Sequence, residues 1–258
     1  MLASAGVRVI PDLERESKRV MILQARMTST RLPGKVLKSV AGKPMLVWEL
    51  DQLAAAQNYD RLVVATTTNR EDDPIEALCA ERGVGCYRGS ECDVLSRYAG
   101  AARVYLARTV IRVTGDCPLI DPAVVDQVIR LYAEQQPTDY ASNTCARTFP
   151  RGCDVEVFSR EVLDAANAEA TDPAEREHVT PFLYRRPERF RILQYRQERD
   201  ESHLRWTVDT PEDLELVTRI LTSLGTRTGP FHKSEILAIL EEHPDWIRIN
   251  ADVRQVRV

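Results

Sequence analysis

Thr109-Val-Ile-Arg-Val-Thr-Gly-Asp-Cys-Pro-Leu-Ile-Asp-Pro122 combines a short β-branched run, a turn and a helix start. Residues 109–113 predict a buried strand, and Asp121-Pro122 is typical of a helix N-terminus. Asp116 lies in the turn between them. In an open parallel sheet, such a turn lies at the carboxyl end of a strand, along the crevice where ligands bind. The sequence therefore predicts that Asp116 faces a ligand site.

Asp209 lies in a second segment of the same kind, Arg205-Trp-Thr-Val-Asp-Thr-Pro-Glu-Asp213. Residues 205–208 predict a strand that returns to the sheet. Thr210 and Asp213 have the spacing of a capping box, which opens the helix that follows. We expect Asp209 to lie at the same edge of the sheet as the first aspartate.

Asp116 and Asp209 are more informative as a pair than alone. Each is a common turn residue by itself, but Asp121 and Thr210 can already cap the two helices. The pair is therefore free to act on a ligand. Two carboxylates that meet at one edge suit Mg²⁺, which prefers oxygen ligands.

Strands and helices alternate through the first half of the chain. This alternation up to about residue 136 predicts an α/β fold, a Rossmann-like and mostly parallel sheet with helices on both faces. The buried strands are predicted at residues 20–23, 62–66, 84–87 and 109–113.

The pattern of apolar runs along the sequence also predicts how the chain is divided into regions. Residues 1–19 look like an N-terminal extension, and residues 20–225 form the main domain. Within this domain, residues 138–195 contain short alternating runs and predict a small inserted, partly antiparallel region. Residues 226–258 predict a helical tail that includes an amphipathic helix over 234–242.

Composition excludes several classes of protein. Of 258 residues, 43% are hydrophobic and 29% are charged, and the net charge is −4. These values fit an ordinary globular protein and do not indicate a nucleic-acid binder. Six cysteines without a C-x-x-C pair predict reduced thiols. Because the sequence has neither a signal peptide nor a run long enough to span a bilayer, we expect a cytoplasmic protein with no membrane partner.

A basic loop, Gln24-Ala-Arg-Met-Thr-Ser-Thr-Arg-Leu-Pro-Gly-Lys35, follows the first predicted strand. A charged surface loop can be merely solvated, but this one opens onto the edge where the fold binds ligands. Gly34 permits close approach of the backbone. Arg31 can donate two hydrogen bonds to phosphate oxygens, and Arg26 and Lys35 add positive charge. The loop therefore predicts a site for a nucleoside triphosphate with magnesium.

Two other phosphate motifs are absent from the sequence. Val36 stands where a P-loop needs Ser or Thr, and Ser29 stands where its first glycine belongs. The segment Gly83-Val-Gly-Cys-Tyr-Arg88 lacks the third glycine of the dinucleotide fingerprint. We therefore expect neither a nicotinamide nor a flavin cofactor.

Three further features have both a functional and a structural interpretation. Thr66-Thr-Thr-Asn69 follows the second strand and can hydrogen-bond a base or a ribose, although polar clusters also form ordinary turns. Asp154-Val-Glu156 places two carboxylates on one strand face, as a ligand contact or as a solvated edge. His178 can act in catalysis or bind an acidic substrate, although a histidine at a helix boundary is more often structural.

The sequence resembles the nucleotide-sugar cytidylyltransferases, and in particular the spore-coat polysaccharide branch, which is related to the CMP-sialate and CMP-3-deoxy-octulosonate synthetases. The resemblance runs from about residue 20 to the C-terminus. It rests on these segments in this order: Ile22-Leu-Gln-Ala-Arg26, Ser29-Thr-Arg-Leu-Pro-Gly-Lys-Val36, Gly42-Lys-Pro44, Ala65-Thr-Thr-Thr-Asn69, Arg88-Gly-Ser90, Thr114-Gly-Asp-Cys-Pro-Leu119, Arg176-Glu-His-Val179 and Val208-Asp-Thr-Pro-Glu-Asp213.

This resemblance implies a nucleotidyltransferase fold similar to that of GT-A enzymes, and a homodimer. It also implies CTP in the first loop and Mg²⁺ on Asp116 and Asp209, with Arg31 and Lys35 as the other catalytic residues. The nucleotide-binding residues are then Gln24, Ala25, Arg26, Ser29, Thr30, Gly34, Thr66, Thr67 and Arg88. The acceptor-binding residues are predicted in or near the inserted region, at Arg147, Arg151, Asp154, Glu156 and His178.

The predicted activity is transfer of CMP from CTP to a sugar acid, sugar phosphate or phosphonate, with release of pyrophosphate. One alternative is a glycosyltransferase of similar architecture, which usually carries Asp-x-Asp; Asp154-Val-Glu156 is the nearest variant here. Another alternative is a protein that binds the nucleotide without catalysis. The sequence does not identify the acceptor beyond a small anionic molecule.

Overall fold

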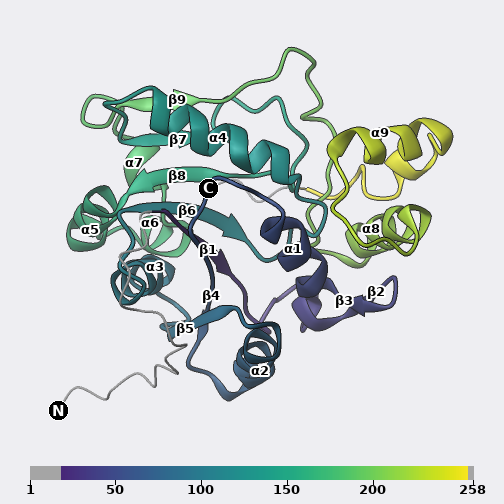
Figure 1. The fold of residues 1–258 in the computed structure, drawn as a ribbon, viewed down its shortest axis with the longest axis horizontal. Coiled ribbons are helices and arrows are strands. Elements are labelled where there is room, and N and C mark those ends of the chain that lie inside the picture. The colour runs from purple at the N-terminus through teal and green to yellow at the C-terminus, as the bar shows by residue number, and fades with distance from the viewer. Residues whose placement is uncertain (1–18, 255–258) are drawn as a thin grey trace.

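The computed structural model describes residues 19–254, which contain a seven-stranded sheet with helices on both faces (Figure 1). The strand order is β5-β4-β1-β6-β8-β7-β9. The α/β fold with a mostly parallel sheet is therefore confirmed. The predicted extension lies outside the described residues except for Arg19, which opens β1.

The parallel part of the sheet is built from β1 (Arg19–Gln24), β4 (Arg61–Thr67), β5 (Gly85–Gly89) and β6 (Thr109–Thr114). These four strands match the four predicted buried runs. Helices follow the strands as expected for right-handed crossovers. They are α1 (Met45–Ala54), α2 (Asp73–Arg82), α3 (Val94–Val104) and α4 (Pro122–Glu134).

Residues 138–195 complete the sheet with β7 (Tyr140–Ser142), β8 (Glu156–Ser159) and β9 (Ile192–Gln194). Strand β8 is antiparallel to both β6 and β7, so an antiparallel element is present in this region as predicted. Strand β9 forms the sheet edge opposite β5 (Figure 1). Three helices belong to the same region: α5 (Arg160–Glu169), α6 (Pro173–His178) and α7 (Pro181–Tyr184).

The predicted strand at 205–208 is wrong. The segment is extended, but its only strand-like contact within the described residues is an isolated bridge between Arg151 and Arg205. The physical reason is that β8 occupies the position beside β6 that a further parallel strand would need. Val208 nevertheless reaches the sheet edge, because its N–H donates to the carbonyl of Asp116 at 2.8 Å.

The sheet separates two apolar cores. In β1, Met21 and Leu23 face the core that contains α1, α2, α4 and the C-terminal helices. Val20 and Ile22 face the core that contains α3, α5 and α7. All four side chains are fully buried, as expected for a strand covered on both faces.

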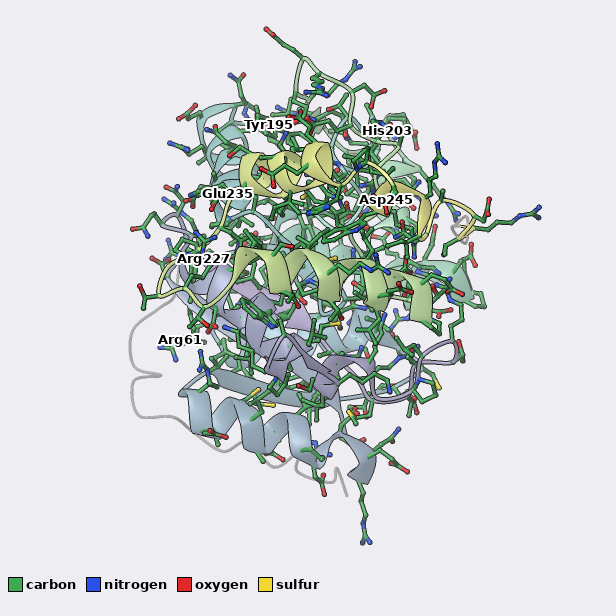
Figure 2. The ribbon with its side chains drawn as sticks, turned by 90° about the vertical axis from the view of Figure 1, so that its right-hand side faces the viewer. Arg61, Tyr195, His203, Arg227, Glu235 and Asp245 are labelled. Carbon is green, nitrogen blue, oxygen red and sulfur yellow. The ribbon has the colours of Figure 1, made fainter. Side chains whose placement is uncertain are left out.

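The remaining elements of the described residues are a hairpin, two α-helices and three short 3-10 helices, and the hairpin and both α-helices lie on the right-hand side of Figure 1. They are the β2–β3 hairpin (Ser39–Val40, Lys43–Pro44), α8 (Pro211–Leu224), α9 (Lys233–Glu242), and the short 3-10 helices η1 (Lys35–Leu37), η2 (Arg70–Asp72) and η3 (Trp246–Arg248). The predicted capping box of α8 and the predicted C-terminal helix are both confirmed. Figure 2 shows Arg227 beside Glu235 of α9, and the two pair at 2.9 Å. Within residues 19–254, each helix is too short or too polar to cross a membrane.

Candidate active site

A cleft of about 270 Å³ opens at the carboxyl ends of β1 and β6. Its floor includes Gln24 and Thr114, the last residues of these two strands. The basic loop forms one wall, and residues from α3 and α6 form another. The lining residues are Gln24, Ala25, Arg26, Ser29, Thr30, Arg31, Lys35, Val36, Val94, Arg97, Arg112, Thr114, Gly115, Asp116, Glu177, His178 and Asp209.

Lys35 lies between the two aspartates that the sequence singles out. Its Nζ is 3.3 Å from Asp116 Oδ2 and 2.9 Å from Asp209 Oδ1, and it also donates to the carbonyl of Val208 at 2.7 Å. Gly34 presents this lysine from a left-handed backbone conformation (φ 68°). Asp116 and Asp209 therefore do converge, around an ammonium group.

Burial alone would lower the pKa of Lys35, but the charges of Asp116 and Asp209 outweigh it and raise the pKa. Burial likewise opposes ionisation of Asp116. Its pKa is nevertheless lowered, because Lys35 supplies positive charge and Thr114, Cys117 and Lys35 supply hydrogen bonds. The cluster therefore favours a charged lysine beside a charged aspartate.

A tight turn positions Asp116. The Thr114 hydroxyl donates to Asp116 Oδ1 at 2.7 Å. Gly115 is required at this turn, because a Cβ atom there would lie 2.7 Å from the carbonyl oxygen of Gln24. The carboxylate is therefore held between β1 and β6, at the floor of the cleft.

A network from the C-terminal half positions Asp209. Arg205 donates to Asp209 Oδ2 at 2.8 Å, and Arg31 approaches the same oxygen at 3.1 Å. Arg205 also pairs with Asp213 at 2.8 and 3.0 Å. Asn250, near the end of the described chain, donates to Asp213 Oδ1 at 2.8 Å. The sequence analysis missed Arg205 and Asn250. In the sequence, the only sign of this network is the four-residue spacing from Arg205 to Asp209.

The carboxylates of Asp116 and Asp209 could offer oxygen ligands to a metal ion in the cleft. Both side chains are partly exposed, Asp116 by 25% and Asp209 by 16%, and each directs one oxygen to the same Lys35 ammonium. No larger group of metal-binding side chains occurs among residues 19–254. Mg²⁺ commonly takes one or two protein carboxylates and completes its shell with phosphate oxygens and water, so Asp116 and Asp209 are the residues that could hold it.

The predicted nucleotide-binding residues separate into two groups. The first lines the cleft and consists of Gln24, Ala25, Arg26, Ser29 and Thr30. Gly34 belongs to the same loop but not to the cleft lining, and its N–H donates to the carbonyl of Met27 at 2.8 Å.

The second group, Thr66, Thr67 and Arg88, lies outside the cleft lining. Both threonine hydroxyls donate to the buried carboxylate of Asp72, at 3.0 and 2.5 Å. Arg88 pairs with Asp73 at 2.6 Å and Glu76 at 2.8 Å. In this structure these side chains organise the β4–α2 connection.

The predicted acceptor-binding residues are also divided. His178 lines the cleft, and its pKa is lowered chiefly by burial. Arg147 and Asp154 pair with each other through two hydrogen bonds of 2.5 and 2.8 Å. Arg151 lines a different cavity of about 180 Å³, next to α8 and α9.

The expectation that Asp154 and Glu156 share one strand face is wrong, because β8 begins at Glu156. Glu156 is 5% exposed, pairs with Arg112, and accepts hydrogen bonds from Tyr140 at 2.5 Å and Thr180 at 2.6 Å. Its carboxylate is therefore occupied by protein groups.

Glu49 is a buried carboxyl group that the sequence analysis did not single out. It lies on α1, is fully buried, and accepts the N–H of Cys117 at 3.2 Å through Oε2, whereas Oε1 has no partner within the described residues. Burial raises its pKa well above the usual value, and the negative charge of Asp116 adds to this effect. The protonated form is favoured. Because Glu49 stands in a run of apolar helix residues, the sequence does not indicate that it lies near the site.

The fold and the cleft place the chain among α/β proteins that bind a small charged ligand at the carboxyl edge of a sheet. The family model for cytidylyltransferases matches residues 20–242, and the chain belongs to this family. Membership makes the chain an enzyme, and the predicted family resemblance is confirmed.

Relatives and a solved structure agree with this assignment. The spore coat polysaccharide biosynthesis protein SpsF of Bacillus subtilis is 36% identical over 242 residues, which cover 88% of this chain and 95% of SpsF. A 3-deoxy-manno-octulosonate cytidylyltransferase of Pseudomonas fluorescens is 38% identical over 109 residues, 42% of each chain. The solved structure of a cytidylyltransferase from Leptospira borgpetersenii is 32% identical, with a TM-score of 0.85, and the match covers 93% of this chain and 99% of that one.

Proposed function

We propose that this cytidylyltransferase uses CTP and Mg²⁺ to transfer CMP to a small anionic acceptor. An acceptor oxygen attacks the α-phosphorus, and a new P–O bond forms as the bond to the bridging β-phosphate oxygen breaks. Pyrophosphate leaves with the electron pair, and a hydroxyl acceptor gives up its proton. The observation that carries this proposal is the convergence of Asp116 and Asp209 on Lys35 in the cleft.

The basic loop supplies charge for the triphosphate. Arg26, Arg31 and Lys35 all line the cleft. At an effective dielectric of about 20, each cation about 4 Å from a phosphate contributes roughly 4 kcal/mol before the cost of desolvation. Charge placed where the pyrophosphate leaves stabilises the transition state as well as the bound nucleotide.

Asp116 and Asp209 would hold Mg²⁺, which supplies charge neutralisation at the α-phosphate and favours the deprotonated form of an attacking hydroxyl. Thr114 and Arg205 orient the two carboxylates. The protein's own contribution is therefore mainly positioning and fixed charge.

For the acceptor, we propose a sugar acid, a sugar phosphate or a phosphonate. The names of two relatives support a sugar-linked product, since one acts on 3-deoxy-manno-octulosonate and the other serves polysaccharide biosynthesis. The alternative glycosyltransferase has no supporting observation, because Asp154 is paired with Arg147 and Glu156 is buried. The homodimer stays a prediction.

An Asp116→Asn variant tests the proposal. The wild type is first screened with the four nucleoside triphosphates and Mg²⁺ against sugar acids, sugar phosphates and phosphonates, with pyrophosphate as the readout. The variant should lose at least about 10²-fold in turnover, the scale of one lost electrostatic element. It should keep its circular dichroism spectrum. The matched control is Asp252→Asn, at an exposed position outside the cleft. Normal turnover in Asp116→Asn would refute the assignment.

A further inference from the structure

Arg97 is a buried arginine on the α3 wall of the cleft. The residue is only 2% exposed, yet it contributes to the cleft lining. Its Nη1 donates to the carbonyl of Ser90 at 2.5 Å, and its Nε has no hydrogen-bond partner. Among residues 19–254, no carboxylate forms an ion pair with this guanidinium.

The other cations of the cleft all have a carboxylate nearby. Lys35 and Arg31 contact Asp209, at 2.9 and 3.1 Å. Arg112 pairs with the buried Glu156, and Arg26 lies 3.8 Å from Glu91.

Among the described residues that line the cleft, Arg97 is therefore the cation that has no carboxylate within 4 Å. Removing a cation from water costs several kcal/mol, and an opposite charge with good hydrogen bonds must offset this cost. One backbone carbonyl satisfies only one of the five N–H donors of a guanidinium. Burial lowers the pKa of Arg97, and the positive charge of Arg26 adds to this effect, while the more distant negative charges of Asp72 and Glu91 oppose it. An anionic ligand in the cleft would supply a direct partner for the guanidinium.

The surroundings of Arg97 indicate which part of the reaction it serves. In the proposed function, the phosphates already have Arg26, Arg31 and Lys35 of the basic loop. Arg97 comes instead from α3, which packs against α6, the helix that brings His178 to the same cleft. Arg112 also lines the cleft, and its guanidinium lies 5.6 Å from the ring of Tyr98, the residue that follows Arg97 on α3.

We propose that Arg97 binds the acidic group of the acceptor, a carboxylate or a phosphate. This inference rests on the proposed function, since it assigns one part of the same cleft to the second substrate. It predicts a preference for anionic over neutral acceptors, with Arg97 as a binding residue.

The stability of the ligand-free protein gives a first test. Arg97→Met should keep or raise the melting temperature, because it removes a buried charge that has no carboxylate within 4 Å and it breaks no ion pair. The matched control Arg112→Met should lower the melting temperature, because it leaves Glu156 buried without its cation. A clear loss of stability in Arg97→Met would show that the protein itself compensates the charge, and would overturn the proposal.

Ligand binding gives the second test, with CTP and Mg²⁺ present at saturation so that the triphosphate site is filled. Inorganic phosphate or acetate, compared with chloride at equal ionic strength, should raise the melting temperature of the wild type. In Arg97→Met the apparent affinity for that anion should fall at least tenfold, with Arg97→Lys intermediate, while calorimetry shows unchanged CTP affinity. Whether phosphate or acetate acts more strongly distinguishes the two acidic groups.

The outcomes separate this inference from the proposed function. If CTP does not bind the wild type, the proposed function fails. If CTP binds but Arg97→Met weakens it, the arginine serves the nucleotide and the acceptor subsite is refuted. An anion response that is absent in the wild type, or that persists in Arg97→Met, also refutes it.

Discussion

In the ligand-free protein, Lys35 holds the two aspartates of the site together. The sequence suggested a phosphate-binding lysine, and the structure places its ammonium between Asp116 and Asp209. The pKa of Lys35 is raised, so its ammonium stays charged until the pH rises through the pKa of Lys35 in the folded protein. The pKa of Asp116 is lowered, so its carboxylate stays charged until the pH falls through the pKa of Asp116 in the folded protein. The attraction between them is therefore constant across neutral pH. It holds the carboxylates together until a ligand cation competes for them.

Glu49 leads to a prediction about pH. Its pKa is raised well above the usual value, so the folded protein keeps a proton that the unfolded chain releases above about pH 4.3. The unfolded state then binds fewer protons, and stability falls as the pH rises towards the raised folded pKa. Glu49→Gln cannot release this proton. Relative to the wild type, it should gain about 1.4 kcal/mol per pH unit across this window.

Urea denaturation at pH values from 4 to 8 measures this effect. The constant offset between Glu49→Gln and the wild type reports packing, and only the change of that offset with pH reports the proton. Glu81→Gln changes an exposed residue on α2, so its free energy of unfolding should differ from that of the wild type by the same amount at every pH. Parallel curves for Glu49→Gln as well would mean that the buried carboxyl ionises as freely as an exposed one.

At the scale of elements, the C-terminal segment reaches back to the active site. Asn250 follows η3 and donates to the carbonyl of Arg205 at 3.0 Å and to Asp213 at 2.8 Å. Arg205 in turn holds Asp209. Asn250→Ala should therefore lower CTP affinity severalfold and raise the Mg²⁺ concentration that binding requires, because the orientation of Asp209 is loosened. Calorimetry at several Mg²⁺ concentrations measures both effects.

The control for this prediction is Asp252→Ala, an exposed change in the same segment that should leave CTP binding unaltered. Loss of a hydrogen bond to a buried carboxylate should also cost Asn250→Ala about 1.5–3 kcal/mol of stability. A purely structural role would lower the melting temperature alone. Unchanged CTP binding and Mg²⁺ dependence well below that temperature would exclude the positioning role.

The elements also show what the sequence could predict. Short apolar runs followed by helix starts located the four parallel strands, because both faces of such strands are buried. The same pattern failed at 205–208. Residue periodicity cannot distinguish a strand from an extended segment beside a sheet, and β8 had already taken the neighbouring position.

The candidate site could be predicted only in part, for a related reason. Asp116, Asp209 and Lys35 follow from the rule that strand ends share an edge. Arg97 and Glu49 are ionisable residues within helices, and only the packing of those helices reveals that they are buried.

At the scale of the whole molecule, the cleft is assembled from residues between Gln24 and Asp209, so unfolding disperses it completely. A ligand that binds only the folded state stabilises it by about 2.7 kcal/mol at one hundred times its dissociation constant. For a chain of this size that is a rise of roughly 5–10 °C in melting temperature. CTP with Mg²⁺ should produce this rise in a thermal shift assay, and CTP with EDTA should produce much less. Lys35→Ala, measured against its own ligand-free form, should show a smaller shift because it lacks one phosphate-binding charge. An equal shift in Lys35→Ala, or in EDTA, would mean that CTP binds elsewhere than between the basic loop and the two aspartates.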